Sequence, residues 1–508
     1  THRRKLFALL ALSEQVRSVK EFVDCGIHDS DLPFIMEESK SATGPFYLLY
    51  KWHDLRKSDG ADSRKPISCF FSWQDSKLEN FERNQWQLLA PYFELVGRGY
   101  SKVEHYNFAD KIILPFIEDS SDSSTEGGFS NVWRVKIHRA HHNQCPSKNP
   151  TDNPSYAIKR LQKNDEKAFK DEVQALKRFS DKHHYHLINL LMTYHYRGQY
   201  HLVFPWADGN LLDFWKKYPH HDFPPRDWNF AQWVARQWLA VVEGLQAIHK
   251  APTSSSSLPR SETYDPNDPR SHGRHGDMKP ENILWFKSGH QYLQDPDDLG
   301  LFVISDFGLT RFHRSKTVDQ VSPTHLARTP TYRPPECDVS KTISQSYDIW
   351  TLGCVLLEFA IWYLHGWEEV DKASERRAAA ERQAIAEMRA AAAFADGRED
   401  VIPGDKFFEL TENSVVEDDA TIEKVARLKQ CVKDEFKSLR QRGTTRFFHE
   451  MLDYVEDHLL RMRPDMRAKC DDIVHKFTQM HDRCLIDESY CTAEIPRPDR
   501  ADTKLSEL

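Results

Sequence analysis

The chain has 508 residues, of which 39% are hydrophobic and 29% are charged, and this length allows two or more domains. The net charge of −8 gives no basis for general binding to nucleic acid or to an anionic membrane. The 9 cysteines form no C-x-x-C pair and no run of 18 apolar residues occurs, so we expect a reducing compartment, no zinc or disulfide framework and no transmembrane helix.

Residues 1 to about 117 predict a small helical domain ahead of the rest of the chain. Apolar residues follow helical periodicity from Lys5 to Phe22, and large apolar residues recur near helical spacing from Phe81 to Phe93. Two roles are open for this domain: a packing extension on the following domain, or a module that binds a partner. A periodic apolar stripe is more often core than interface, which favours the packing extension.

An acidic, serine-rich linker covers residues 118–126, and a polar loop is expected over residues 138–155. This loop holds His141, His142 and Cys145, which suggest either a metal site or a set of solvated histidines. Solvated histidines are the favoured interpretation, because no metal-ligand spacing is complete.

Three later stretches have a biased composition. Residues 252–272 are rich in Ser, Pro and Asp and should be irregular. Residues 368–396 are rich in Ala, Arg and Glu and predict an exposed helix of mixed charge. A coiled coil or a nucleic-acid site is the weaker alternative there, because alanine fills too many positions to form an adhesive seam. Residues 405–440 predict further helices.

Two short motifs carry the chemistry. Residues 275–282 place Asp277, Lys279 and Asn282 within one short stretch, and residues 305–308 add Asp306. Transfer of a phosphoryl group from ATP needs a carboxylate to orient the attacking hydroxyl, a cation beside the moving phosphate, and oxygen ligands for Mg²⁺. The two motifs supply all three, so they predict a phosphotransferase that uses ATP and Mg²⁺.

With these motifs the chain resembles the eukaryotic-type protein kinase superfamily over about residues 119–480. Further motifs in the expected order and spacing are Tyr156–Lys159, Phe169–Val173, Thr329–Glu336, Asp348–Gly353 and Arg467. The resemblance implies an α+β, bilobal protein-kinase fold with a small β-rich lobe and a large helical lobe, preceded by the small helical domain. The N-terminal region has a looser resemblance to uncharacterised fungal kinase-like proteins.

The resemblance also sets the domain boundaries that we expect. The kinase domain should run over about residues 118–485, with a small lobe at 118–207 and a large lobe at 208–485. Insertions are expected at about 252–272 and 366–445, and a C-terminal tail at 486–508.

The family pattern assigns a role to each candidate catalytic residue. Lys159 should contact the α and β phosphates of ATP, held by an ion pair with Glu172. Asp277 should accept the proton of the substrate hydroxyl, and Lys279 should stabilise charge on the γ-phosphoryl group. Arg467 should pair with Glu336, and the remaining two residues, Asn282 and Asp306, should bind Mg²⁺.

The nucleotide pocket is drafted in the same way. Its phosphate loop should be formed by Gly127, Gly128 and Ser130. The adenine ring should lie between Val132, Ala157 and Leu284, with Phe204 as the gatekeeper and Pro205, Trp206 and Ala207 as the hinge. Pro205 has no N–H but keeps the carbonyl acceptor that this position needs, and the Ala207 N–H is the expected donor to the ring.

Two departures from the family pattern bear on activity. The phosphate loop keeps only Gly127 of the three glycines in G-x-G-x-x-G-x-V, and β-carbons at Thr125 and Ser130 should lower nucleotide affinity or turnover. Gly276 replaces the arginine that usually pairs with a phosphorylated activation segment. Activity should therefore not require phosphorylation there.

The leading interpretation is a serine/threonine kinase that acts on a protein substrate, because Lys279 and Thr329 resemble that group and Glu336 with Arg467 resembles an activation-segment anchor. One alternative is a pseudokinase that binds nucleotide and acts as a scaffold, which the weak glycine loop favours. Another is a kinase-fold enzyme that phosphorylates a small molecule. We expect a cytoplasmic location, with the nucleus as the alternative, and a possible partner for the N-terminal domain.

Overall fold

The computed structural model describes residues 2–39, 46–52, 65–95, 103–121, 125–126, 130–144, 153–161, 166–180, 184–219, 227–251, 273–287, 299–306, 330–340, 344–391, 404–414, 422–441 and 444–495. The chain divides into two compact units. The first comprises Thr1–Phe169 with Leu190–Trp206, and the second comprises Lys170–Asn189 with Ala207–Leu508. The predicted mixture of helices and sheet is confirmed, whereas the two-lobed arrangement stays a prediction. The predicted irregular stretch 252–272 lies outside the described residues.

The N-terminal region is built around an aromatic core. Phe22, Phe34, Phe70, Trp73 and Phe81 are buried, and the centroids of contacting rings lie 5.0 to 6.1 Å apart. The elements of this region are α1 (Arg4–Leu12), α2 (Val19–Asp24), β1 (Phe34–Glu38), β2 (Tyr47–Lys51) and α4 (Asp75–Leu88). The prediction of a helical domain is therefore incomplete, because β1 and β2 form an antiparallel pair within it.

Strand β1 is held by a residue of α4 that is remote in sequence, which is why the β1–β2 pair was not predicted. The Gln85 side chain accepts a hydrogen bond from Phe34 N and donates one to Phe34 O, each at 2.8 Å. A buried backbone N–H and C=O are thereby satisfied by a side chain 51 residues away. Periodicity along the sequence cannot indicate such a long-range partner.

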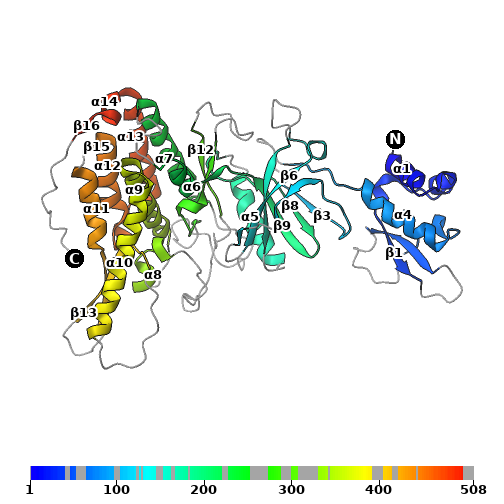
Figure 1. Cartoon of the computed structure of the whole chain (residues 1–508), viewed down its shortest axis with the longest axis horizontal. Helices are drawn as coiled ribbons and strands as arrows, with labels where there is room; N and C mark the ends of the chain where they lie inside the picture. Colours follow the sequence, from blue (N-terminus) through cyan, green and yellow to red (C-terminus); the bar gives the residue numbers. More distant parts are fainter. Residues whose placement is uncertain are drawn as a thin grey trace, which may run out of the picture. The chain divides into compact units, whose positions relative to one another are not determined.

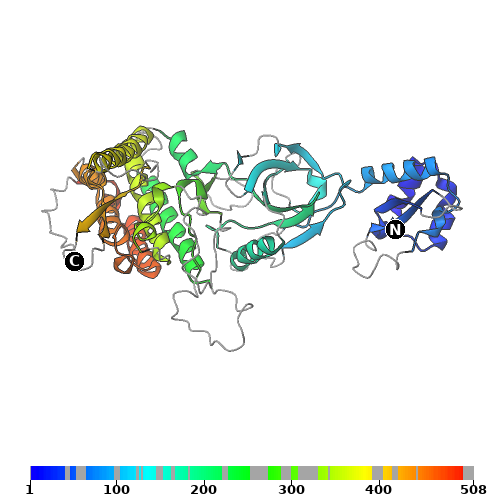
Figure 2. The ribbon, with the colours of Figure 1, turned by 90° about the horizontal axis from the view of Figure 1, so that it is seen from below.

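The first unit also contains a seven-stranded sheet, in the order β3-β8-β9-β7-β6-β4, with β5 as a further partner of β6 (Figure 2). Its strands are β3 (Glu104–Asn107), β4 (Phe116–Asp119), β5 (Thr125–Glu126), β6 (Ser130–Ile137), β7 (Ser155–Leu161), β8 (Met192–Tyr196) and β9 (Gln199–Pro205). β3 runs parallel to β8, and the other pairs are antiparallel. β3 precedes the predicted boundary at residue 117, so the N-terminal extension contributes an edge strand to this sheet.

The histidine-containing loop before β7 packs against the N-terminal extension, which we did not expect. His142 is buried and forms a backbone bridge with Phe93, and the His141 ring contacts Pro91 O at 2.9 Å. Burial lowers the pKa of His142 to about 4. The prediction of solvated histidines is therefore wrong for His142, because the N-terminal extension covers it. Cys145 lies outside the described residues.

The second unit is mainly helical (Figure 1). Its elements up to the middle of the unit are β10 (Gly209–Asn210), α6 (Leu211–Lys217), α7 (Trp228–His249), β11 (Ile283–Phe286), β12 (Leu301–Ile304), α8 (Glu336–Val339) and α9 (Ser346–His365). The later elements are α10 (Trp367–Ala391), β13 (Phe408–Ser414), β14 (Ile422–Leu428), α11 (Gln430–Gln441), β15 (Thr444–Thr445), α12 (Arg446–Tyr454), α13 (Cys470–Ile486), α14 (Glu488–Thr492) and β16 (Glu494–Ile495). Helix α5 (Glu166–Ser180) spans the division between the units.

Helix α9 is the core of this unit. It is long and apolar enough to cross a membrane by length and composition alone, but 94% of its apolar window is buried inside the fold. A β-carbon added at Gly353 would lie 2.9 Å from the Leu459 β-carbon, so glycine allows the neighbouring chain to approach closely. The helix is therefore predominantly apolar because other elements cover it.

Two expectations about the later part of the chain are corrected. Residues 408–414 and 422–428 form an antiparallel hairpin, and in the described part of the stretch 405–440 the helix begins at residue 430. Helix α10 exists, but Val370, Ala373 and Arg377 are buried, so it is not exposed on every side. The packing of these segments depends on partners remote in sequence.

The first residues of the predicted tail, which begins at residue 486, form α14 and β16, and Tyr490 is buried.

Candidate active site

The predicted catalytic residues of one motif converge in a single loop. Lys279 Nζ lies 3.2 Å from Asp277 Oδ2, and Asn282 Nδ2 donates to the same oxygen at 3.0 Å. Asn282 Nδ2 also donates to the Asp277 backbone carbonyl at 2.7 Å. The Asp277 carboxylate is thus held between a cation and an amide, with a side chain that is only 12% exposed. This arrangement keeps the carboxylate in one orientation.

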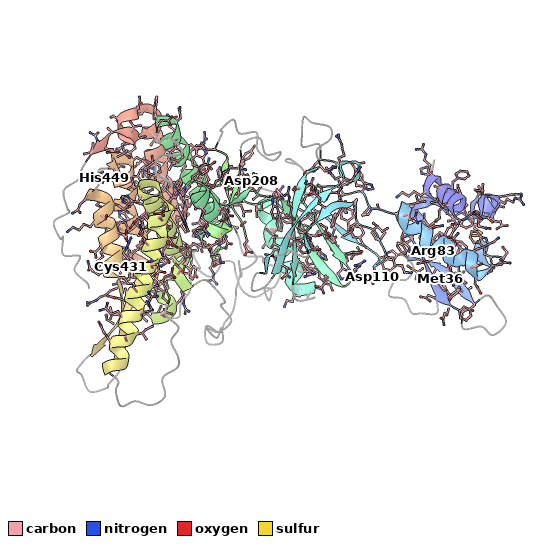
Figure 3. The ribbon with its side chains drawn as sticks, viewed as in Figure 1. Met36, Arg83, Asp110, Asp208, Cys431 and His449 are labelled. Carbon is pink, nitrogen blue, oxygen red and sulfur yellow. The ribbon has the colours of Figure 1, made fainter. Side chains whose placement is uncertain are left out.

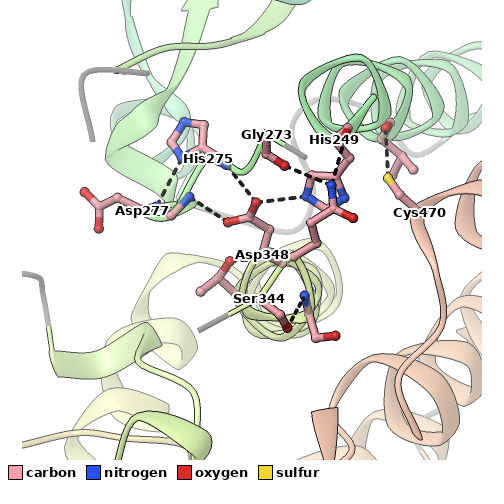
Figure 4. A network of polar contacts seen from close by, with 12 residues as sticks. His249, Gly273, His275, Asp277, Ser344, Asp348 and Cys470 are labelled. Atoms are coloured by element: carbon pink, nitrogen blue, oxygen red, sulfur yellow. Dashed lines mark hydrogen bonds and ion pairs between the residues drawn. The ribbon is translucent and has the colours of Figure 1, made fainter. Parts of the chain in front are cut away.

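The loop is anchored to α9 by Asp348 (Figure 4). Asp348 Oδ2 accepts from the His275 N–H at 2.7 Å, and Oδ1 accepts from the Gly276 N–H at 2.7 Å. Oδ2 also contacts His249 Nε2 on α7 at 2.9 Å. Burial alone would raise the pKa of Asp348, but His249, His275 and the Gly276 N–H lower it below the usual value. A buried, ionised carboxylate therefore fixes the backbone just before Asp277.

The second motif is attached to the same loop. Ser305 N and Ser305 Oγ donate to Asn282 O at 2.8 and 3.0 Å, and His275 Nε2 contacts Ser305 O at 2.8 Å. Asp306 follows with a φ of 60°, which is uncommon for a residue with a side chain. The two motifs are thus joined by hydrogen bonds. Phe307 and Gly308 lie outside the described residues.

Gly276 has a conformational reason for its departure from the family pattern. Its φ is +80°, in the region where a β-carbon is strained, and its N–H is committed to Asp348. Glycine adopts this backbone without strain. An arginine at this position would be strained at this φ, and it would add a cation that glycine does not supply.

Strand pairing places four predicted nucleotide-binding residues on one face of the sheet. Val132 lies opposite Lys159, and Ala157 lies opposite Phe204. Residues directly opposite one another project to the same face, and residues two apart on a strand share it. Val132, Ala157, Lys159 and Phe204 are all half-buried, whereas the alternate positions, such as Ile158, are buried. This face is therefore the more open one.

The remaining site residues are distributed as follows. Ser130 begins β6, Pro205 ends β9, Trp206 and Ala207 follow it, Glu172 lies on α5, and Leu284 lies on β11. Gly127 and Gly128 lie outside the described residues, as does Thr329. Lys159 belongs to the first unit and Glu172 to the second, so their predicted ion pair stays a prediction.

Asp208, labelled in Figure 3, fixes the chain beyond the predicted hinge. Its Oδ2 accepts from Lys287 N at 2.9 Å, and its own N–H donates to Trp285 O at 3.0 Å. These bonds tie the residue after Ala207 to the strand that carries Leu284. Ala207 and Leu284, two of the predicted pocket residues, therefore lie on neighbouring chain segments.

The donor set fits Mg²⁺. Asn282 uses its amide nitrogen on Asp277, which leaves the amide oxygen as its ligating atom, and the exposed Asp306 adds a carboxylate. Within the described ranges, no group of three or more His, Cys, Asp or Glu side chains is placed to hold a metal ion. Mg²⁺ commonly takes one or two protein ligands and completes its shell with phosphate oxygens and water. The site therefore suits a metal that arrives with nucleotide.

Three functional contacts were not predicted from the sequence. The role of Asp348 as loop anchor, its contact with His249, and the bonds between Ser305 and Asn282 all join residues far apart in the chain. A signal was present, because Asp348 is an acidic residue at the start of a predominantly apolar helix. Such a residue calls for buried partners.

Comparison with known proteins agrees with this geometry. Residues 270–477 match the family model described as the protein kinase domain. The dual specificity protein kinase CLK1 of Mus musculus is 36% identical over 88 residues, which cover 17% of this chain and 18% of that protein. Homeodomain-interacting protein kinase 1 of Caenorhabditis elegans is 29% identical over 207 residues, or 40% of this chain and 19% of that protein.

A third relative covers more of the chain. A probable LRR receptor-like serine/threonine-protein kinase of Arabidopsis thaliana is 28% identical over 286 residues, or 54% of this chain and 26% of that protein. The chain thus spans about a fifth to a quarter of the length of these curated relatives.

Proposed function

Since residues 270–477 belong to the eukaryotic-type protein kinase superfamily, we propose that this chain is an ATP- and Mg²⁺-dependent serine/threonine kinase acting on a protein substrate. The observation that carries the proposal is the loop in which Asp277 is held by Lys279 and Asn282 and anchored by Asp348. A protein that only bound partners would not need this set.

The loop geometry supports a direct mechanism. The Asp277 carboxylate accepts a hydrogen bond from the substrate hydroxyl and takes its proton as the new O–P bond forms, while the bond from the γ-phosphorus to the β–γ bridging oxygen breaks and ADP leaves. Lys279, 3.2 Å from that carboxylate, offsets negative charge on the transferred phosphoryl group. Asn282 keeps the carboxylate oriented, so little reorganisation is needed when the hydroxyl arrives.

Different residues would bind the metal and the nucleotide. The Asn282 amide oxygen and the Asp306 carboxylate would hold Mg²⁺, which when bound would neutralise charge on the ATP phosphates. Lys159, with Glu172 as its partner, would contact the α and β phosphates. Val132 and Ala157 on the open sheet face, with Leu284 on β11, would enclose the adenine. The reduced glycine content of the phosphate loop predicts modest ATP affinity.

Serine/threonine preference rests on two residues and on relatives. Lys279 and Thr329 match the serine/threonine group. The names of the relatives include both serine/threonine and dual specificity kinases, so tyrosine is the competing acceptor. Phosphoamino-acid analysis of a mixed Ser, Thr and Tyr peptide set after incubation with Mg·ATP separates the two. Phosphotyrosine as the main product would refute the assignment.

The competing function is a nucleotide-binding scaffold, favoured by the phosphate loop alone. Calorimetry of Mg·ATP binding beside a phosphate-transfer assay distinguishes the two functions. Binding with transfer supports the kinase, and metal-dependent binding without transfer to any acceptor supports the scaffold. Turnover with a small amino alcohol but no peptide would instead support a small-molecule kinase. A cytoplasmic or nuclear location and a partner for the N-terminal region remain part of the proposal.

A further inference from the structure

The residues between α9 and α12 contact the end of the candidate activation segment. We call residues 367–441 the inserted arm; it comprises α10, the β13–β14 hairpin and α11. We call residues 331–338 the docking segment; it includes Glu336, which Arg467 holds with two hydrogen bonds.

Asp405 of the inserted arm binds the docking segment directly. Its Oδ1 accepts a hydrogen bond from Thr331 Oγ1, and its Oδ2 accepts from Ser374 Oγ of α10 at 2.8 Å. Arg377 of α10 donates from Nε to the Asp405 backbone carbonyl at 3.0 Å. Thr331 is buried, so this contact is sheltered from water. One carboxylate of the inserted arm therefore fixes the first residue of the docking segment.

The neighbouring residue Tyr332 is fixed through α9. Glu358 of α9 accepts from the Tyr332 hydroxyl at Oε2 (2.7 Å) and from Arg377 at Oε1 (2.6 Å). Arg377 and Glu358 are 3% and 4% exposed, and the Arg377 guanidinium lies 4.1 Å above the Phe407 ring. Burial raises the pKa of Glu358, and Arg377 and Tyr332 offset this only in part. The carboxylate is thus shared between the core helix, the docking segment and the inserted arm.

The other end of the docking segment has a further ion pair. Lys406 Nζ lies 2.9 Å from Asp338 Oδ2, and Arg333 lies 2.9 Å from the second oxygen of Asp338. α8 also packs against β14. Contacts from the inserted arm therefore reach both ends of the docking segment, and the pair at Asp338 is only 15–22% exposed.

The docking segment and the catalytic loop are held on one helix. Asp348 anchors the loop, and Glu358, ten residues later on α9, anchors Tyr332. The loop that carries Asp277 and the docking segment are therefore both fixed to α9, so displacement of the docking segment is expected to change how a peptide presents its hydroxyl to Asp277.

We propose that the inserted arm is a permanent clamp on the docking segment, with Asp405 and Arg377 as positioning residues for a protein substrate. The inference rests on the proposed kinase function. In the family pattern, an arginine at position 276 pairs with a phosphate on the activation segment and so orders it. This chain has Gly276 there, and we infer that the buried contacts of the inserted arm order the segment instead.

Steady-state kinetics with a peptide acceptor test the clamp. Asp405→Ala and Thr331→Val remove the same contact from its two sides, and Asp405→Asn keeps an acceptor for Thr331. We expect Asp405→Ala and Thr331→Val to raise the peptide KM about tenfold or more, as loss of a hydrogen bond to a charged group does. The ATP KM and the ATP hydrolysis rate without peptide should stay within about twofold, and Asp405→Asn should recover part of the loss.

The matched control is Arg382→Ala. Arg382 lies on α10 with an exposed partner, Glu375, at 3.9 Å, and among the described residues neither side chain has a hydrogen bond or ion pair with the docking segment. It should leave the peptide KM unchanged. An unchanged peptide KM in both Asp405→Ala and Thr331→Val would overturn the clamp. A parallel loss of peptide and ATP parameters would also overturn it, because that pattern indicates general destabilisation.

Hydrogen exchange separates failure of the clamp from failure of the proposed function. Amides of residues 331–340 should exchange faster in Asp405→Ala than in wild type or Arg382→Ala, whether or not the chain transfers phosphate. If wild type transfers nothing to peptide, the kinase function fails, and the clamp is then judged on exchange. Equal exchange in all three proteins would refute the clamp.

Discussion

Removal of the Arg467 side chain should destabilise the second unit strongly. Arg467 donates from two nitrogens to the two oxygens of Glu336, each at 2.7 Å, and the side chains are 0% and 2% exposed. It also donates to the carbonyls of Arg461 and Ser346 at 2.8 and 2.9 Å. Arg467→Ala leaves a buried carboxylate without its counterion, which costs about 3–5 kcal/mol.

The assay is thermal unfolding followed by tryptophan fluorescence, since the Arg467 guanidinium lies 5.2 Å from the Trp350 ring. A loss of this size lowers the unfolding midpoint by roughly 4–7 °C, because the unfolding entropy scales with the size of the second unit, Lys170–Asn189 with Ala207–Leu508. Glu336→Gln combined with Arg467→Met should recover much of the loss, because no unpaired charge remains.

Arg463→Ala is the matched control. Arg463 also donates from two nitrogens to the two carboxylate oxygens of Asp465, Nε at 3.2 Å and Nη2 at 2.6 Å, but both side chains are more than 60% exposed. Water screens such a pair, so the midpoint should hardly change. If Arg467→Ala lowers the midpoint no more than Arg463→Ala does, the reasoning about burial is refuted.

Three further predictions concern the catalytic loop. Phosphatase treatment should leave peptide phosphorylation within about twofold, because Gly276 supplies no cation for a phosphate; a large loss of activity would contradict this. Gly276→Ala should cost about 1–2 kcal/mol in unfolding free energy, since its φ is +80°, and an unchanged denaturation midpoint would argue against strain. The folded pKa of Asp348 is below 3.8, so its stabilisation is present above pH 3.8 and is lost as pH falls through the lowered value. Midpoints measured against pH should therefore fall less steeply in acid for Asp348→Asn, and parallel curves would contradict the assignment.

The parts of the site that were predicted from sequence are those set by short spacing. Asp277, Lys279 and Asn282 lie within one loop, so their proximity follows from the chain itself. The pair of Glu336 with Arg467 is confirmed although the residues are far apart, because the kinase motifs fix the position of both. Asp306 is bonded into the same region through its neighbour Ser305.

The parts that were missed depend on partners distant in sequence. The β1–β2 pair and the β13–β14 hairpin were missed because burial by remote segments decides these strands, and the charged residues of β14 resemble a helix surface. The buried Arg377 was missed for the same reason. Its side chain belongs to a helix of mixed charge, and only the position of Glu358 and Asp405 shows that it is paired.

The most direct test of the account is the rate of γ-phosphate transfer from Mg·ATP to a serine/threonine acceptor, measured for wild type beside Asp277→Asn. Asparagine keeps the size of the side chain and removes the base, so we expect the variant to be about 10²–10⁴-fold slower while binding Mg·ATP as tightly. Equal rates in the two proteins, or no transfer by folded wild type, would contradict the proposal that this loop performs phosphate transfer.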